Sequence, residues 1–325
     1  MSPDVSAFLL DLYRVSRRLA HTEFRQWVFD ELGKLVQLDS GFWYRAAVGD
    51  ENSNFHAWYL YRQPDTLIQE YSAGKLWMDD VVYDKALAAP PCTAVHVSYG
   101  DYSSERMRAF LKRYRQEYVM TIFVFQEIPQ IAAGFSLYRN ETRRPFSDDD
   151  VSNIETVAPH VIDAWRENWL SETIRKASRR PAPVEFCLAV LMPDQILSEA
   201  QDNFGQLMHL EWPGWQGPRL PPELQSCLIS LKPSPWTGKA ISVYHRKQPD
   251  ETTLLLVRRS HPWDRLGPRK RMVALLFAEG ASQTQVAERA HLSPSTVNNY
   301  LGSIYRELEL TDKTALSRLV ERLHP

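Results

Sequence analysis

The chain has 325 residues, of which 44% are hydrophobic and 24% charged, as in ordinary globular proteins. At roughly 100–200 residues per domain, this length predicts two or three domains. The formal net charge of −2 excludes a chain that is basic along its whole length, so any contact with nucleic acid must be local. The glycine-rich motifs that cradle phosphates are absent from the sequence, which argues against a nucleotide-driven machine.

The three cysteines, Cys92, Cys187 and Cys227, are widely spaced. No C-x-x-C pair or Cys/His cluster accompanies them, so we expect reduced thiols, no metal site and no cofactor. The sequence shows neither a signal peptide nor an apolar run of about 18 residues. These features predict a soluble cytoplasmic protein that does not enter a membrane.

Two breaks divide the chain. The basic, proline-containing stretch 173–182 is typical of a linker. A second break lies near Ser260–Pro268, where His-Pro and Gly-Pro interrupt two apolar runs. We therefore expect domains at residues 1–172, 183–259 and 260–325.

The first segment predicts an α+β domain with helices against an antiparallel sheet. Apolar residues at helical spacing occupy residues 5–15. Ser103 or Ser104 can cap a helix that runs to about Glu117, and Ser147 begins a last helix. The predicted strands cover residues 41–48, 55–61, 93–99, 118–127 and 131–139.

The last helix of this segment contains Pro159, which we expect to kink or interrupt it. Its apolar stripe predicts packing in the domain's own core, with a dimer interface as the alternative. The stripe consists of Val151, Ile154, Val157, Val161, Ile162, Trp165 and Trp169.

The middle segment predicts a small α+β domain. A strand at 184–191 leads to a helical stretch near 195–210. A loop rich in Pro, Gly and Trp follows, and then strands at about 238–246 and 252–259, which we expect to form a hairpin.

The last sixty residues predict four short helices. Pro268 suits a first helical turn, and Gly280 suits the end of that helix. Ser282-Gln-Thr-Gln is a capping box, and Ser293-Pro caps a third helix that extends to about Leu308. Asp312 caps a fourth.

The third helix has two different faces. Its apolar positions are Val297, Leu301, Ile304 and Leu308. On the opposite face, Asn298 and Asn299 can pair with the N6/N7 edge of adenine, and Gly302 permits close approach. Two short capped helices with such a face predict a helix-turn-helix domain that enters a major groove.

This region closely resembles the C-terminal DNA-binding domain of LuxR-type (GerE-like) transcription regulators. The resemblance rests on Leu266-Gly-Pro-Arg, Ala278-Glu-Gly, Val286-Ala-Glu-Arg, Leu292-Ser-Pro-Ser-Thr-Val, Ile304-Tyr-Arg, Leu308 and Asp312-Lys-Thr. It implies that residues 295–303 form the recognition helix and that Gln283-Thr284 begin the scaffold helix. It also implies that the fourth helix is similar to one through which such domains often pair.

The candidate DNA-binding residues combine base-reading and phosphate-contacting side chains. They are Gln283, Thr284, Arg289, Ser295, Thr296, Asn298, Asn299, Gly302, Ser303, Arg306 and Lys313. Members of the family usually carry Lys where this chain has Asn298, and Glu where Lys270 and Met272 stand. We therefore expect direct readout by the two asparagines in place of the usual lysine contact.

The other segments resemble sensor domains. Ala158-Pro159-His160, with apolar residues after it, is similar to the closing helix of GAF-like domains, and the order of elements in the middle segment is similar to a PAS-like fold. Aromatic residues crowd the first segment, as in pockets for organic molecules. The candidate effector-binding residues are Trp43, Trp58, Tyr59, Tyr61, Tyr71, Trp77, Asp79, Asp80 and Tyr83.

Together these features predict a one-component transcription regulator that is not an enzyme. We expect it to bind double-stranded DNA at a two-fold site as a homodimer, to sense a small organic effector, and to contact RNA polymerase if it activates. Tyr71 to Val82 also resembles acyl-homoserine-lactone receptors, but Asp79-Asp80 stands where these have Asp-Pro, and the middle domain is extra. A lactone receptor, and a regulator controlled by protein association alone, are the alternatives.

Overall fold

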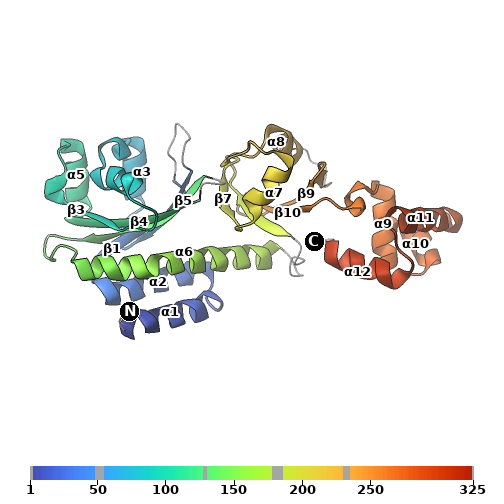
Figure 1. The fold of residues 1–325 in the computed structure, drawn as a ribbon, viewed down its shortest axis with the longest axis horizontal. Coiled ribbons are helices and arrows are strands. Elements are labelled where there is room, and N and C mark those ends of the chain that lie inside the picture. Colours follow the sequence, from blue (N-terminus) through green and yellow to red (C-terminus); the bar gives the residue numbers. More distant parts are fainter. Residues whose placement is uncertain (1–2, 48–54, 127–129, 178–185, 230–234, 324–325) are drawn as a thin grey trace. The chain divides into compact units, whose positions relative to one another are not determined.

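The structure is a computed structural model that describes residues 3–47, 55–126, 130–177, 186–229 and 235–323. The chain forms two compact units (Figure 1). The first contains Met1–Thr173 with Ile196–Glu199 and Gln216–Arg219, and the second contains the remaining residues. None of the helices within the described ranges is long and apolar enough to span a membrane.

A five-stranded antiparallel sheet forms the centre of the first unit, in the order β2-β1-β5-β4-β3. Its strands are β1 (Ser40–Ala47), β2 (Phe55–Tyr61), β3 (Val95–Ser98), β4 (Tyr118–Gln126) and β5 (Ile131–Arg139). Every residue of the central strand β5 is buried, because helices cover both faces of the sheet. All the predicted strands are confirmed, with ends that differ by no more than two residues.

Three helices cover each face of this sheet (Figure 1). On one face lie α1 (Pro3–Ser16), α2 (His21–Val36) and α6 (Asp148–Ala177). On the other lie α3 (Thr66–Ala73), α4 (Val81–Ala88) and α5 (Glu105–Arg113), with the 3-10 turns η1 (Leu76–Asp79) and η2 (Tyr99–Asp101). The sequence analysis missed α3 and α4, because eight residues make too few turns for a clear helical period.

Helix α5 begins as predicted, with Ser104 Oγ accepting from Met107 N at 3.4 Å. Its predicted end near Glu117 is wrong. The helix stops at Arg113, and Arg115 adopts a positive φ of 54°. A left-handed residue ends the helical hydrogen-bond pattern and returns the chain to the sheet.

Helix α6 is capped as predicted, with Asp150 N donating to Ser147 Oγ at 3.2 Å. We expected Pro159 to kink or interrupt this helix; it does not interrupt it, since the helix is continuous from Asp148 to Ala177. An internal proline costs about 3 kcal/mol, which the burial of a whole apolar stripe offsets. Trp165, fully buried, stacks on Trp43 of β1 at 4.3 Å between ring centroids, so the stripe packs in the domain's own core as predicted.

A second sheet has the order β7-β6-β10-β9-β8. Its elements are β6 (Cys187–Leu191), β7 (Leu197–Ala200), α7 (Phe204–Glu211), α8 (Pro222–Ile229), β8 (Trp236–Thr237), β9 (Ile241–Lys247) and β10 (Thr253–Arg259). The predicted hairpin is confirmed, with Thr253 opposite Lys247. Residues 197–200 were predicted to be helical and form a strand instead, in which every residue is buried.

The predicted linker, residues 173–182, is only partly tested. Helix α6 continues to Ala177, so its first five residues are helical. Residues 178–182 lie outside the described part of the chain.

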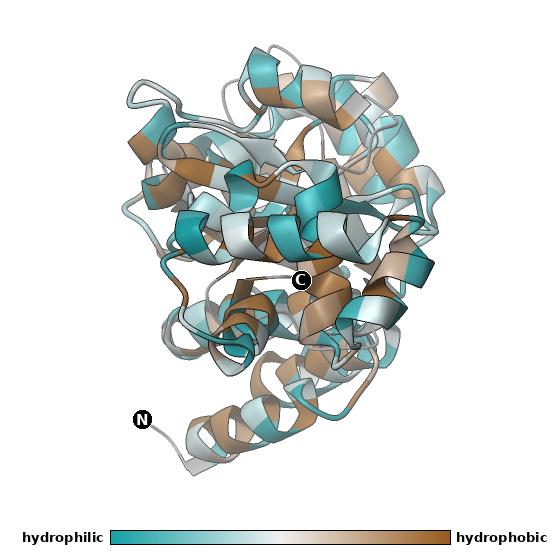
Figure 2. Cartoon of the chain, turned by 90° about the vertical axis from the view of Figure 1, so that its right-hand side faces the viewer, coloured by the Kyte–Doolittle hydropathy of each residue, from teal (hydrophilic) through white to brown (hydrophobic). Residues whose placement is uncertain are grey.

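The C-terminal part contains the four predicted helices, α9 (Pro268–Ala278), α10 (Gln283–Ala290), α11 (Pro294–Glu307) and α12 (Lys313–Leu323), after the 3-10 turn η3 (Pro262–Arg265). Figure 2, in which this end of the chain faces the viewer, shows hydrophilic and hydrophobic residues alternating along these helices, as in amphipathic helices. Gly280 ends α9 with a φ of +104°, which suits glycine. The core contains Trp263, Val273, Val286, Val297, Leu301, Ile304 and Leu316.

A buried carboxylate joins these helices to the second sheet. Asp264 of η3 accepts from Ser242 Oγ at 2.8 Å and from Tyr244 OH at 2.6 Å, both on β9. It also pairs with Arg258 of β10 at 2.5 Å, and both side chains are almost fully buried. Breaking such a hydrogen-bonded pair is costly, so Asp264 holds η3 against the second sheet.

Candidate functional site

Helices α10 and α11 are joined by a tight turn. His291 ends α10 with a positive φ of 52°, and Leu292 N donates to the carbonyl oxygen of Ala287 at 2.8 Å. Ser293 then caps α11 by accepting from Thr296 N at 3.1 Å. The turn between two capped helices has the geometry of a helix-turn-helix motif.

One face of α11 is buried and the opposite face is exposed. Val297, Leu301 and Ile304 face the core. Asn298 and Asn299 are exposed, and the hydrogen bonds found among the described residues include none to either amide. Each amide can therefore donate and accept towards a base edge in a major groove.

Gly302 lies on the same exposed face. A Cβ added there would meet no atom within 4 Å, so packing within the domain does not require glycine. Glycine in a helix interior is unfavourable by about 0.5–1 kcal/mol relative to alanine. Its presence on this face is consistent with the close approach of another surface.

Two arginines beside this face can reach phosphates. Arg306 is exposed in the last turn of α11. Arg289 lies 3.5 Å from Glu279, and both side chains are more than half exposed. Because exposed ion pairs contribute little, Arg289 can leave this partner for a phosphate oxygen.

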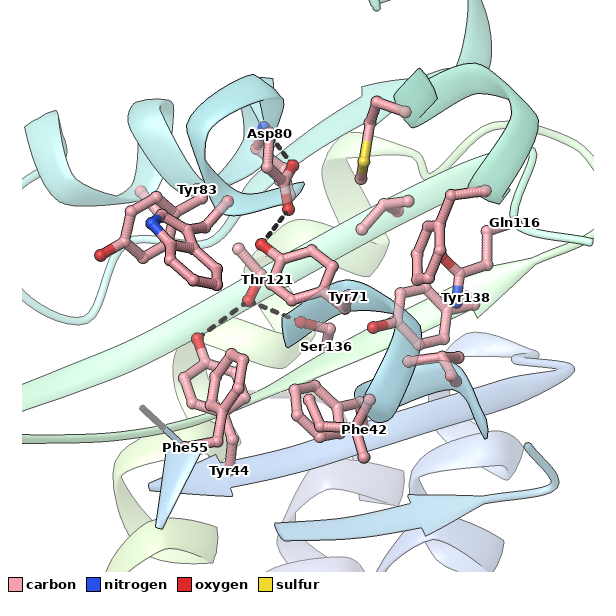
Figure 3. Close-up of a pocket in the computed structure, with 18 of the residues that line it drawn as sticks. Phe42, Tyr44, Phe55, Tyr71, Asp80, Tyr83, Gln116, Thr121, Ser136 and Tyr138 are labelled. Carbon is pink, nitrogen blue, oxygen red and sulfur yellow. Dashed lines mark hydrogen bonds between the residues drawn. The ribbon is translucent and has the colours of Figure 1, made fainter. Parts of the chain in front are cut away.

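A cavity of about 90 Å³ lies between the first sheet and the layer of α3, α4 and α5. This is several times the volume that one water molecule requires. Figure 3 shows the lining side chains converging from the strands below and the helices above. Most of the wall is apolar or aromatic, with Phe42, Phe55, Trp77, Met107 and Phe110 among the lining residues.

Asp80 is the carboxylate of this cavity and is almost fully buried. It accepts from Tyr71 OH at 2.8 Å and from Tyr102 OH at 3.0 Å, and it caps α4 by accepting from Val82 N at 3.2 Å. Burial raises the pKa of Asp80, and these three hydrogen bonds oppose that rise. The tyrosines fix the carboxylate in the position from which it can accept from a ligand.

A chain of hydroxyls crosses the floor of the cavity (Figure 3). Ser136 Oγ donates to Thr121 Oγ1 at 2.9 Å, and Thr121 Oγ1 lies 3.3 Å from Tyr44 OH. Thr121 and Ser136 are directly opposite each other on β4 and β5. Burial raises the pKa of Tyr44 to about 12, so this hydroxyl stays neutral.

Comparison with protein families matches residues 264–320 to the bacterial regulatory proteins of the luxR family. The matched stretch contains the turn between α10 and α11 and the exposed face with Asn298 and Asn299. Residues 264–320 form a LuxR-type DNA-binding domain. The chain is therefore a DNA-binding transcription regulator, as the sequence analysis predicted. A search of curated protein sequences found no match.

Solved structures with some likeness include other regulators and sensor domains. CepR2, an N-acylhomoserine lactone dependent LuxR family factor from Burkholderia cenocepacia, is 11% identical over 49% of this chain and 92% of its own, with a TM-score of 0.39. SdiA from Escherichia coli is 12% identical over 98% of this chain and 96% of its own, with a TM-score of 0.40. A phycoerythrobilin-bound GAF domain from a cyanobacterial phytochrome is 12% identical over 53% of this chain and 100% of its own, with a TM-score of 0.38. Likeness at this level supports no conclusion about ligands.

The predicted DNA-binding residues of the LuxR-type domain differ in their exposure to solvent. The exposed ones are Gln283, Thr284, Arg289, Ser295, Asn298, Asn299, Gly302 and Arg306. Three are half-buried. Thr296 Oγ1 lies 2.8 Å from Ser293 Oγ, and Ser303 Oγ donates to Glu307 Oε1 at 2.7 Å.

The third half-buried residue, Lys313, is engaged within the domain. Its ammonium donates to the carbonyl oxygen of Ala281 at 3.0 Å and lies 4.2 Å from the centre of the Phe277 ring. These contacts hold α12 to the end of α9. Lys313 was predicted to contact phosphate, and in the structure its ammonium stabilises the packing of α12.

The cavity contains four of the nine predicted effector residues, Tyr71, Trp77, Asp80 and Tyr83. The other five are not among its lining residues. Trp43, Tyr59 and Tyr61 pack with the helices on the opposite face of the sheet, against Trp165 and Phe29. Trp58 and Asp79 point elsewhere, since Trp58 is 45% exposed and Asp79 pairs with Arg106 at 2.7 Å.

Trp43, Tyr59 and Tyr61 were misplaced because successive strand residues face opposite sides of a sheet, and aromatic content alone does not say which side holds the cavity. Trp58 is opposite the lining residue Tyr44 on the edge strand β2, but its side chain is exposed and does not line the cavity. The sequence analysis also missed Tyr102, Gln116, Thr121, Ser136 and Tyr138, which line the cavity. Thr121 and Ser136 carried a usable signal, because each is a hydroxyl within an otherwise apolar strand.

Proposed function

We propose that a small organic effector bound in the cavity controls this transcription regulator. The observation that carries the proposal is Asp80, a buried carboxylate that Tyr71 and Tyr102 hold at the edge of a mainly aromatic space. Ligand sites combine apolar walls with a few fixed polar groups, as this cavity does. An N–H or O–H group on the effector would donate to Asp80, and its apolar body would contact the aromatic walls.

The proposed organisation has three domains. Residues 1–172 form the GAF-like sensor, residues 183–259 a PAS-like domain, and residues 260–325 the DNA-binding head. The contacts of Asp264 support the transmission of a change from the second sheet to the head, because they bind β9 and β10 to η3. An effector changes the affinity for DNA only as far as it binds two states of the regulator unequally.

We further infer that the regulator acts in the cytoplasm as a homodimer on a two-fold DNA site, and contacts RNA polymerase where it activates. A single recognition helix reads few base pairs, so two copies are needed for specific affinity. Arg289 and Arg306 would contact phosphates, and Asn298 and Asn299 would read bases.

Native mass spectrometry of the full chain tests the effector directly. We expect an added mass on the wild type and on Asp79→Leu, and its loss from Asp80→Leu, because leucine has a similar volume and no acceptor. Asp79 is the matched control, because it is the neighbouring carboxylate and does not line the cavity. Denaturing extraction would then release the molecule for identification.

The alternatives give different results in the same experiment. Saturable binding of N-acyl-homoserine lactones that depends on Asp80 would support a lactone receptor. A dimer without added mass, whose DNA affinity does not respond to a small-molecule extract of the host cell, would contradict effector sensing and favour control by protein association.

A further inference from the structure

One buried polar group of the cavity is not satisfied by the protein. Gln116 lies between α5 and β4 and is 3% exposed. Its backbone N–H donates to the carbonyl oxygen of Leu111 at 2.9 Å, which fixes the position of the residue. Its side-chain Nε2 is buried and has no hydrogen-bond partner among the described residues. A buried amide without a partner is unfavourable, so its presence in the wall of a cavity needs an explanation.

Asp80 and Thr121, two other polar residues that line the cavity, differ from Gln116. Asp80 accepts from two tyrosines, and Thr121 is bonded to Ser136 and faces Tyr44. Because these groups already have hydrogen-bond partners in the protein, their burial does not require a ligand. Gln116 alone among the labelled side chains of Figure 3 offers a buried, unpaired N–H₂ group.

Gln116 also lies apart from Asp80. In Figure 3 its amide is beside the Tyr138 ring, on the side of the cavity away from Tyr83 and Asp80. Thr121 lies on the floor of the cavity, three residues after Tyr118, the first residue of β4. Three residues of strand extend about 10 Å. Gln116 comes two residues before that strand. Asp80 and Gln116 therefore lie at two separated places in the cavity wall, with the bonded hydroxyls of Tyr44, Thr121 and Ser136 on the floor and aromatic side chains between them.

We propose that Gln116 determines effector specificity by binding an oxygen at the end of the effector remote from Asp80. This rests on the proposed effector site. The effector class is then an elongated molecule with an N–H or O–H donor at one end, an apolar body, and a hydroxyl or carbonyl oxygen at the other. The amide of Gln116 can donate to either oxygen, and it can also accept from a hydroxyl.

The first experiment measures the thermal unfolding of the ligand-free full chain with Gln116→Met. Methionine has a similar volume and no donor, so it removes the unpaired amide without leaving a void. We expect the Tm to rise by roughly 2–4 °C, since the unmade hydrogen bond disappears. A lowered Tm would show that the amide has a partner in solution, and would overturn the proposal independently of any ligand.

The second experiment uses octanamide and ω-hydroxyoctanamide as probes. Both carry an amide N–H₂ for Asp80, and they differ only in the terminal hydroxyl. Binding to the full chain can be followed by isothermal titration calorimetry. We expect the wild type to bind the hydroxylated probe about tenfold more tightly, and Gln116→Met to abolish this preference.

The outcomes separate this proposal from the effector site itself. If both probes bind through Asp80 with equal affinity in the wild type and in Gln116→Met, the effector site stands and the role of Gln116 is wrong. If binding is unchanged in Asp80→Leu, which has no acceptor at this position, the proposed effector site is wrong. If neither probe binds the wild type, the proposed ligand class is overturned.

Discussion

The DNA-binding face of α11 and the cavity of the N-terminal domain carry their polar groups in opposite ways. On α11, Asn298 and Asn299 are exposed, have no partner among the described residues, and come from one 14-residue helix. In the cavity, Asp80 is buried and bonded to Tyr71 and Tyr102, which come from other elements of the fold. A surface that reads DNA can keep polar groups solvated until it binds, whereas a closed site must satisfy them itself or leave them for a ligand.

The largest expected effect of a substitution is on the stability of the cavity. Asp80→Ala removes the acceptor for Tyr71 and Tyr102, and orphaning each buried hydroxyl costs about 1–3 kcal/mol. Denaturation of the full chain by urea measures this loss. Asp79→Ala is the control: it loses a partly exposed ion pair with Arg106 and a hydrogen bond from Ser104, and should be destabilised less than Asp80→Ala. If the two variants lose the same free energy of unfolding, the hydrogen bonds of Asp80 do not stabilise the protein more than the contacts of Asp79.

A smaller effect is expected at the recognition face, and on specificity alone. Asn298→Ala and Asn299→Ala should each lose about 1–3 kcal/mol of discrimination at particular base pairs. Their thermal stability should stay that of the wild type, because both side chains are exposed. Competition binding with single-base variants of the operator measures the discrimination. If cognate and random DNA lose affinity equally, the asparagines do not read bases.

Gly302→Ala should separate stability from binding. Alanine is favoured over glycine in a helix interior by about 0.8–1 kcal/mol, and the added Cβ meets nothing within the domain. The variant should therefore unfold at a higher temperature and yet bind DNA more weakly, since the new methyl group occupies the space needed for close approach. If the variant is more stable and binds DNA with the affinity of the wild type, Gly302 does not lie at the DNA interface.

Lys313 and Arg306 should differ in their salt dependence. Arg306→Ala should reduce the slope of log affinity against log salt by about 1, as expected for one lost phosphate contact. Lys313→Met should leave the slope unchanged and destabilise the head, because its ammonium is bonded to the Ala281 carbonyl and lies over Phe277. A reduced slope for Lys313→Met would restore the phosphate contact that the sequence predicted.

The smallest effect concerns pH. Burial raises the pKa of Asp80 in the folded protein above its usual 3.8. The folded state therefore binds this proton more tightly than the unfolded state, and the associated stability is lost as the pH rises from about 3.8 through the folded pKa. Asp80→Asn cannot ionise, so its stability relative to wild type should increase over this range. Parallel curves for the two proteins, measured by urea denaturation, would contradict the raised pKa.

The success of the sequence analysis differed between these regions for a physical reason. In the head, the caps at Ser282 and Ser293 and the apolar spacing of α11 act within a few residues, so local pattern alone predicted the turn and the exposed face. In the cavity, Tyr71 and Asp80 were predicted, but Trp43 and Tyr61 were placed in the same site although they face the other side of the sheet. Two short helices, α3 and α4, were not predicted at all, and they form part of the wall.

The sequence by itself determined the LuxR-type domain, the strands of the first sheet and the presence of a carboxylate among aromatic residues. These depend on helical spacing, strand alternation and capping, which are local. Only the tertiary structure decided that Asp80 and not Asp79 enters the cavity, that Lys313 holds α12 in place, and that Gln116 is left with an unpaired amide. Each of these depends on which residues from distant segments meet, because burial and the satisfaction of hydrogen bonds are properties of the packed chain.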